Sequence, residues 1–191
     1  MDDFRSTYRE GNKSELIALV KKAAAGDYEA FGKLYAIFVT PIYRYVFYQV
    51  KDKMTAEDVT EEVFLKAWKA MPSCCGKEAT FSSWLYRIAH NQVVDVFRSQ
   101  QKHVPLELAA EVPSMTHDGE IRVEHQELLN AIARLPEDQR RIIVLKFIQG
   151  MGNQEISQVT GKSEGAIRIL QMRALAQLRE TPGQGRLGNG Y

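Results

Sequence analysis

Residues 153–179, NQEISQVTGKSEGAIRILQMRALAQLR, carry the pattern that decides the fold of the C-terminal part of the chain. A short periodic apolar segment, a turn at Gly161 and a longer periodic segment predict two helices at a steep angle. Ile156 and Val159 form the apolar side of the first helix, and Ser163 can cap the second. This pattern is typical of a helix-turn-helix, whose second helix enters the major groove of DNA.

The second of these helices has an apolar side and a polar side. Apolar residues recur at helical spacing, and they are Ile167, Leu170, Ala174 and Leu178. Arginine can donate two hydrogen bonds to guanine and glutamine can bond adenine, so the polar side could read bases. Its candidate residues are Arg168, Gln171, Arg173 and Gln177, with Lys162 and Ser163 placed for a phosphate at the helix start.

The charge distribution helps to decide whether the polar side of the second helix binds DNA or is merely exposed to solvent. The whole chain has a formal net charge of only +1. From Arg140 to Arg179, however, seven cations face two anions, which leaves a local charge of +5. A three-helix bundle with a merely solvated polar side is the alternative interpretation, and the local basic excess favours DNA.

Helix signals also dominate the first half of the chain, and period-two alternation is nearly absent. Two predicted helices span 56–71 and 81–101, and an earlier one runs from Ser14 to Gly26. The second helix starts after Asp27, is bent or restarted by Pro41, and continues at least through Tyr48. Ser14, Asp27 and Thr80 are the expected caps, while Thr55 with Asp58 resembles a capping box. Packing of the four helices is expected to bury Phe31, Leu34, Phe38, Val63, Phe64, Trp68, Trp84, Leu85 and Ile88.

The predicted fold class is all-α, with two small helical domains joined by a flexible linker. The first domain spans 14–101 and the second, with the helix-turn-helix, spans 120–180. Residues 102–119 contain two prolines and lose the helical periodicity, so they read as the linker, or alternatively as a long ordered loop. The glycine-rich tail 181–191 is expected to be disordered.

Composition argues against several classes of protein. No segment reaches the ~18 uninterrupted apolar residues of a membrane helix, and no signal peptide is evident, so a cytoplasmic protein is expected. The histidines form no catalytic set and no phosphate-binding glycine loop occurs, so neither an enzyme nor a cofactor is expected. Cys74 and Cys75 are adjacent in a predicted exposed loop and read as reduced thiols, with no spacing for a metal.

Two polar clusters in the first domain are ambiguous from pattern alone. Asp58, Glu61 and Glu62 lie on the polar side of the helix AEDVTEEVFLKAWKAM, and such clusters are usually solvated. Asn91, Asp95 and Arg98 follow at i, i+4 and i+7, which places them within about 60° on one helix face. They could contact bases or simply bond one another, and spacing alone favours the second.

Four motifs in this order resemble extracytoplasmic-function (ECF) sigma factors, over roughly residues 14–180. The motifs are AEDVTEEVFLKAW, FSSWLYRIAHNQVVDVFR, LPEDQRRIIVLKFIQGMGNQEIS and SEGAIRILQMRALAQLRE. The resemblance implies that Asp58, Glu61 and Glu62 contact the clamp helices of the largest subunit of core RNA polymerase. It implies that the loop 72–80 takes a base flipped from the non-template strand of the upstream promoter element. Asn91, Asp95 and Arg98 would then line the melting strand.

The resemblance also assigns the second domain and suggests regulation. Lys162, Ser163, Arg168, Gln171 and Arg173 would read the minus-thirty-five element of promoter DNA as duplex. An anti-sigma factor is expected to hold the protein silent by covering both domains.

The sequence departs from the family pattern at two places. Glutamine is usual at Glu61. The recognition helix is often more basic where this chain has Leu170, Leu175, Ala176 and Gln177, which either widen the buried face or mark a different promoter sequence.

Rival functions are a dimeric helix-turn-helix regulator with a helical sensor domain and a helical adaptor that binds only protein. For the first, no dimer surface or ligand pocket can be named from the sequence. The second would not need the +5 stretch.

Overall fold

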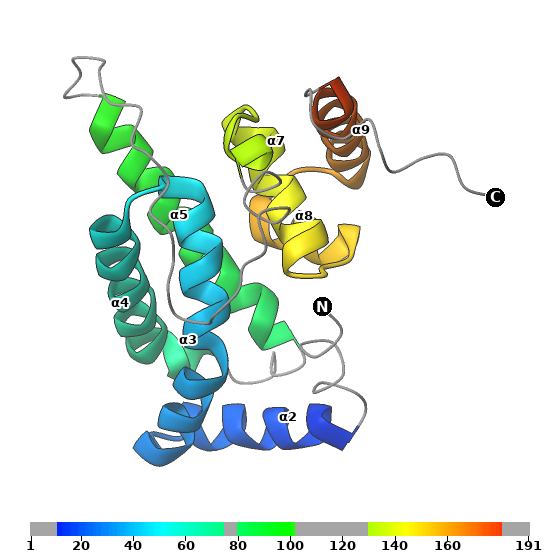
Figure 1. Cartoon of the computed structure of the whole chain (residues 1–191). Coiled ribbons are helices and arrows are strands. Elements are labelled where there is room, and N and C mark those ends of the chain that lie inside the picture. Colours follow the sequence, from blue (N-terminus) through cyan, green and yellow to red (C-terminus); the bar gives the residue numbers. More distant parts are fainter. Residues whose placement is uncertain (1–10, 75–79, 102–129, 181–191) are drawn as a thin grey trace, which may run out of the picture.

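The computed structural model of the chain describes residues 11–74, 80–101 and 130–180 (Figure 1). Every regular element in these three ranges is helical, which confirms the all-α prediction. The predicted linker 102–119 and tail 181–191 lie outside the described residues.

The first group of helices consists of α2 (Gly11–Ala24), α3 (Tyr28–Val50), α4 (Lys53–Ala70) and α5 (Phe81–Gln101). A 3-10 turn, η1 (Met71–Cys74), follows α4. In Figure 1, α2 lies across one end of the group. It begins at Gly11, ahead of the predicted cap Ser14.

The N-terminus of α3 forms as predicted, but the helix does not restart at Pro41. The Asp27 carboxylate accepts a hydrogen bond from the backbone N–H of Ala30 at 3.0 Å. The helix then runs through Pro41 to Val50 without a break. Phe38 and Ile42 are both buried beside the proline, and their packing offsets its cost of ~3 kcal/mol.

The start of α4 differs from the prediction. Asp52, not Thr55, is the N-cap: its carboxylate accepts a hydrogen bond from the backbone N–H of Thr55 at 2.7 Å. The helix therefore begins at Lys53, three residues before the predicted Ala56. Both residue types cap helices, and here the carboxylate gains additionally from the positive helix end. Hydrogen bonds from Thr55 also lower the pKa of Asp52.

The core of this group matches the predicted residues. Leu34, Phe38, Val63, Phe64 and Leu85 are buried. The other four predicted residues are partly buried and pack against that core, and they are Phe31, Trp68, Trp84 and Ile88.

The exposed-loop prediction for the cysteines is wrong for Cys74, which is fully buried in η1. It lies among the core residues, where a small apolar thiol packs well. Cys75 lies outside the described residues.

The second group contains α7 (Glu137–Ile143), a π-helical turn η3 (Val144–Ile148), α8 (Asn153–Thr160) and α9 (Glu164–Glu180). Gly161 ends α8 in the left-handed region, with φ of 71°. Ser163 caps α9 as predicted, since its hydroxyl accepts a hydrogen bond from the N–H of Ala166 at 3.3 Å. Ile156 and Ile167 are fully buried between the two helices.

The two groups dock against each other, with α8 against α5 and α7 against α3 (Figure 1). The Tyr86 hydroxyl donates to the side-chain oxygen of Gln149 at 2.6 Å, and the amide of Gln149 donates to the carbonyl of Pro41 at 3.5 Å. The Arg140 Nε donates to the Gln49 side chain at 3.5 Å. Both Gln49 and Arg140 are buried, so a polar seam lies between the two groups.

Candidate nucleic-acid interface

The helix α5 has a buried apolar side and an exposed polar side. Leu85, Ala89 and Val93 are buried, whereas Asn91, Asp95 and Arg98 are all exposed. The structure therefore brings the predicted trio together on one open face.

The ion pair within this trio, between Asp95 and Arg98, is weak. Asp95 and Arg98 lie 3.8 Å apart, with both side chains largely exposed. Such surface pairs contribute at most about 1 kcal/mol, so either side chain can exchange its partner for a ligand at small cost.

Arg87 extends this polar face and was missed by the sequence prediction. It is exposed and lies one turn before Asn91 on α5. The i, i+4 spacing of Arg87 and Asn91 could have revealed it. We call Arg87, Asn91, Asp95 and Arg98 the α5 stripe; it offers amide, carboxylate and guanidinium groups along one helix face.

The predicted residues at the start of α9 already have partners. Lys162 donates to Asp138 of α7 at 3.2 Å, and Ser163 is occupied as the helix cap. Arg168 pairs with Glu164, one turn earlier, at 3.5 Å.

The remaining two predicted residues lie on different sides of α9. Gln171 is half-buried and donates to the side-chain oxygen of Asn153 at 3.1 Å, so it faces α8. Arg173 is exposed, as is Arg168. The two arginines are thus the predicted residues that α9 presents most openly.

The apolar departures in α9 have two different explanations. Leu170 is half-buried and packs against the core, so it widens the buried face. The buried face is not widened by the three other departures, which are exposed: Leu175, Ala176 and Gln177. Two further apolar side chains, Ile169 and Met172, are also exposed, and the sequence prediction overlooked them.

A third exposed surface lies on α4. Asp58 and Glu61 are exposed, while Glu62 is half-buried and pairs with Lys66 at 3.5 Å. Met54 and Leu65 are exposed as well. Met54, Asp58, Glu61 and Leu65 recur at i, i+4, i+7 and i+11, so they form one mixed apolar and acidic face, here called the α4 face.

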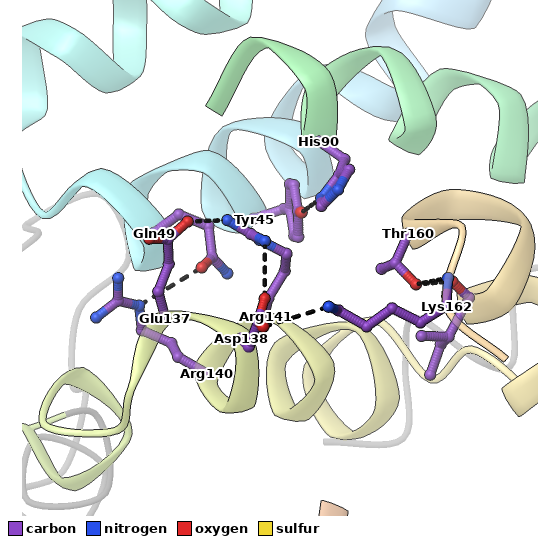
Figure 2. Close-up of polar contacts among 10 residues, drawn as sticks. Tyr45, Gln49, His90, Glu137, Asp138, Arg140, Arg141, Thr160 and Lys162 are labelled. Atoms are coloured by element: carbon purple, nitrogen blue, oxygen red, sulfur yellow. Dashed lines mark hydrogen bonds and ion pairs between the residues drawn. The ribbon is translucent and has the colours of Figure 1, made fainter. Parts of the chain in front are cut away.

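Near the contact of α7 with α3, His90 of α5 lies beside Tyr45, with charged side chains of the second helical group close by (Figure 2). Arg141 is buried and pairs with Glu137 and Asp138 of its own helix. The Tyr45 hydroxyl lies 3.4 Å from Nδ1 of His90. Burial first, and then the positive charges of Arg141 and Lys162, lower the pKa of His90 from 6.5 to about 4. His90 is therefore neutral near pH 7.

A metal-binding cluster and a membrane-spanning helix are both absent from the part of the chain that the structure describes. Within it, no cluster of three or more histidine, cysteine, aspartate or glutamate side chains is arranged to hold a metal. Over the same residues, none of the helices has the length and apolar character to cross a membrane.

Comparison with known protein families gives one match in each half of the chain. The Sigma-70 region 2 family matches residues 34–103, and the Sigma-70, region 4 family matches residues 125–178.

Relatives and solved structures agree with these matches. The ECF RNA polymerase sigma factor BldN of Streptomyces coelicolor is 35% identical over 175 residues, which cover 88% of this chain and 66% of BldN. The ECF RNA polymerase sigma factor SigX of Bacillus subtilis is 31% identical over 163 residues, which cover 80% of this chain and 83% of SigX. The structure of CnrH in complex with the cytosolic domain of CnrY superimposes with a TM-score of 0.67 at 26% sequence identity. The superposition covers 86% of this chain and 94% of the matched chain.

Proposed function

This chain belongs to the ECF sigma factors of RNA polymerase, and from that membership we propose that it binds core polymerase and directs it to promoters through two separate DNA-contacting surfaces. The observation that carries this proposal is the presence of two exposed nucleic-acid-type faces, one on each helical group. The first is the α5 stripe, and the second is the outer side of α9 with Arg168 and Arg173.

The α5 stripe suits the single strand that forms when the minus-ten element opens. Unpaired bases expose hydrogen-bonding edges, and Asn91 and Asp95 can bond them. Arg87 and Arg98 supply positive charge for the backbone of the same strand. A duplex would instead need an element that enters a groove, and one side of α5 is covered by α4 of the same helical group.

The outer side of α9 suits the duplex minus-thirty-five element. As the second helix of a helix-turn-helix, it can enter the major groove with its first turns against the bases. Backbone N–H groups at the start of α9 would bind a phosphate, and Lys162 would add its charge by exchanging Asp138 for that phosphate. Arg168 and Arg173 are then the side chains for base edges or flanking phosphates.

The α4 face is proposed as the contact for the clamp helices of core polymerase. Its acidic groups provide attraction to a basic partner, and Met54 and Leu65 provide exposed apolar area beside them. Interfaces commonly combine an apolar centre with charged residues that fix register.

The docked arrangement of the two groups must open for this function. The names of the two elements place them roughly 25 base pairs apart, which is about 85 Å of duplex at 3.4 Å per pair. A compact chain of this length has a radius of gyration of only about 16 Å. The polar seam around Gln49, Arg140 and Gln149 therefore has to separate before α5 and α9 can reach both elements.

Silencing by an anti-sigma factor is part of the same proposal. CnrH, a structural relative, was solved in complex with the cytosolic domain of another protein, CnrY. A partner that binds both helical groups at once would hold them together and prevent the separation just described. The protein would act in the cytoplasm, as an initiation factor and not as an enzyme.

The Arg98→Ala variant tests the role of the α5 stripe. We expect it to reduce strand opening at the minus-ten element by roughly ten-fold, because a charge-assisted contact of the guanidinium with the strand backbone contributes ~1.5–3 kcal/mol. Permanganate reactivity of the opened thymines would measure this. Lys33→Ala removes another exposed cation, which pairs with a carboxylate of its own helix α3 as Arg98 does on α5, and it is the matched control. An equal loss in both variants would refute a specific role for the stripe.

The Arg168→Ala variant tests base reading by α9. We expect binding to the upstream duplex to weaken by ~1–3 kcal/mol, measured as affinity of the holoenzyme for promoter fragments. Glu164→Gln should strengthen it slightly, because it removes the carboxylate that pairs with Arg168 and that would repel phosphate. An equal loss on random DNA would assign Arg168 to phosphate and contradict base reading.

A further inference from the structure

The outward face of α9 carries an exposed apolar stripe that takes no part in packing α9 against the rest of its helical group. Gly165, Ile169, Met172 and Ala176 recur at i, i+4, i+7 and i+11, so they fall within about 60° of one another. All four are exposed, with Ile169 at 48% and Met172 at 66% of full exposure. The opposite side of α9, through Ile167 and Ala174, already supplies the packing against the rest of its group.

Cations flank this apolar stripe on both sides. Arg168 and Arg179 lie along one edge and Arg173 lies along the other, and all three are exposed. On the described part of α9, only Glu164 and Glu180 are acidic, at the two ends of the helix. The face is thus apolar along its centre and positive along its borders.

This combination fits a polyanion that offers apolar groups at the bottom of a groove. Double-stranded DNA does so in the major groove, where the C5-methyl group of thymine projects between the charged backbones. A purely apolar protein partner would not call for arginines on both borders. The positive borders, together with the position of α9 as the second helix of a helix-turn-helix, therefore favour DNA over a protein as the occupant of the apolar stripe.

Gly165 supports close contact between α9 and an outside molecule, independently of the charge pattern. A glycine inside the first turns of a helix costs about 0.5–1 kcal/mol relative to alanine. A Cβ at this position would meet no atom within 4 Å beyond the neighbouring backbone of α9 itself, so packing against the rest of the protein does not require the glycine. Close approach of an outside molecule does explain it, at the end of α9 that would enter the groove.

We propose that Ile169 and Met172 read thymine methyl groups in the minus-thirty-five element, and that Gly165 allows the helix to come close enough. This rests on the proposed function, and it names the specificity determinants of that same surface. The upstream element of this factor accordingly contains thymine at one or two positions where α9 lies in the groove.

The test replaces thymine by deoxyuridine, one position at a time, in the upstream element of a promoter that the holoenzyme transcribes. Deoxyuridine lacks only the methyl group and keeps the base pair. At one or two positions we expect holoenzyme binding to weaken about four-fold, which corresponds to ~0.8 kcal/mol for one buried methyl group. Ile169→Ala or Met172→Ala should bind more weakly and no longer respond to that replacement.

A pair of glycine variants supplies the matched control. Gly32 lies in α3, where a Cβ would likewise meet no atom within 4 Å beyond the neighbouring helix backbone. Both Gly165→Ala and Gly32→Ala should stabilise the protein slightly, because alanine favours a helix. Only Gly165→Ala should weaken binding to the upstream element.

The outcomes separate this inference from the proposed function. If no deoxyuridine replacement changes the affinity of the native holoenzyme, while a specific upstream sequence is still selected, the methyl-reading inference is wrong and the proposed function stands. If the Ile169 and Met172 variants keep the response to deoxyuridine but lose binding to core polymerase, the apolar stripe is a protein contact and the inference is wrong. If no upstream sequence is selected at all, the proposed function itself fails.

Discussion

Changing Asp58 and Glu61 together to lysine is expected to lower the affinity for core polymerase by roughly 100-fold. Like charges placed across an interface cost several kcal/mol, and ~2.7 kcal/mol corresponds to a factor of 100. Both side chains are exposed, and the buried residues of α4, such as Val59 and Val63, lie on its other side. The substitutions should therefore leave the fold of the protein intact.

A matched double variant separates a local contact from a general charge effect. Glu15→Lys with Glu29→Lys makes the same change in net charge at exposed positions on α2 and α3. Affinity measured by titrating labelled protein with core polymerase should stay within a few-fold of the native value for this control. Equal losses in both double variants, or no loss in either, would contradict the assignment of the α4 face.

Acidification is expected to destabilise the protein through His90 by about 2 kcal/mol between pH 7.5 and pH 5. The pKa of His90 is lowered to about 4 in the folded protein, against 6.5 in an unfolded chain. The unfolded chain thus binds the proton more readily. The stability that the neutral imidazole contributes is fully present above pH 6.5 and is lost as the pH falls from 6.5 towards 4.

The groups around His90 explain why it resists protonation. Its surroundings include Tyr45 of α3, Arg87 of its own helix, and Asp138, Arg141 and Lys162 from the second helical group. Of these, Asp138 favours the charged imidazole, while the three cations oppose it. Since Arg141 and Lys162 belong to the other group, acid should weaken the docking of the two groups in particular.

Urea unfolding at the two pH values, for the native protein and for His90→Gln, measures this contribution. The native protein should lose about 2 kcal/mol more than the variant, because glutamine does not titrate. An NMR titration of the His90 ring gives its pKa directly. A value near 6.5 in the folded protein would show that the imidazole is not enclosed in this way.

Local residue patterns predict the elements of this fold well but resolve competing signals less well. Asp27, Ser163 and Gly161 act where the sequence places them, because each signal depends on a few neighbouring residues. Asp52 and Thr55 both carry cap signals, and only the folded chain decides between them. The helix through Pro41 shows tertiary packing prevailing over a local preference.

The sequence predicts the exposed faces and the docking contacts of the protein less completely than it predicts the helices. Helical spacing places Asn91, Asp95 and Arg98 on one face, and the structure agrees. The docking of the two helical groups depends on contacts between residues about 60 to 110 positions apart, such as Tyr86 with Gln149, and no local pattern reports these. Exposure of Ile169 and Met172 follows only once the buried side of α9 is known.

Transcription reconstituted from purified components tests the central assignment most directly. The protein is mixed with core polymerase and a library of promoter fragments, and the transcripts are sequenced. We expect the protein to co-purify with core and to start transcription from fragments that share two sequence elements, one upstream duplex element and one element that opens near the start. A protein that neither binds core nor starts any transcript would contradict the assignment.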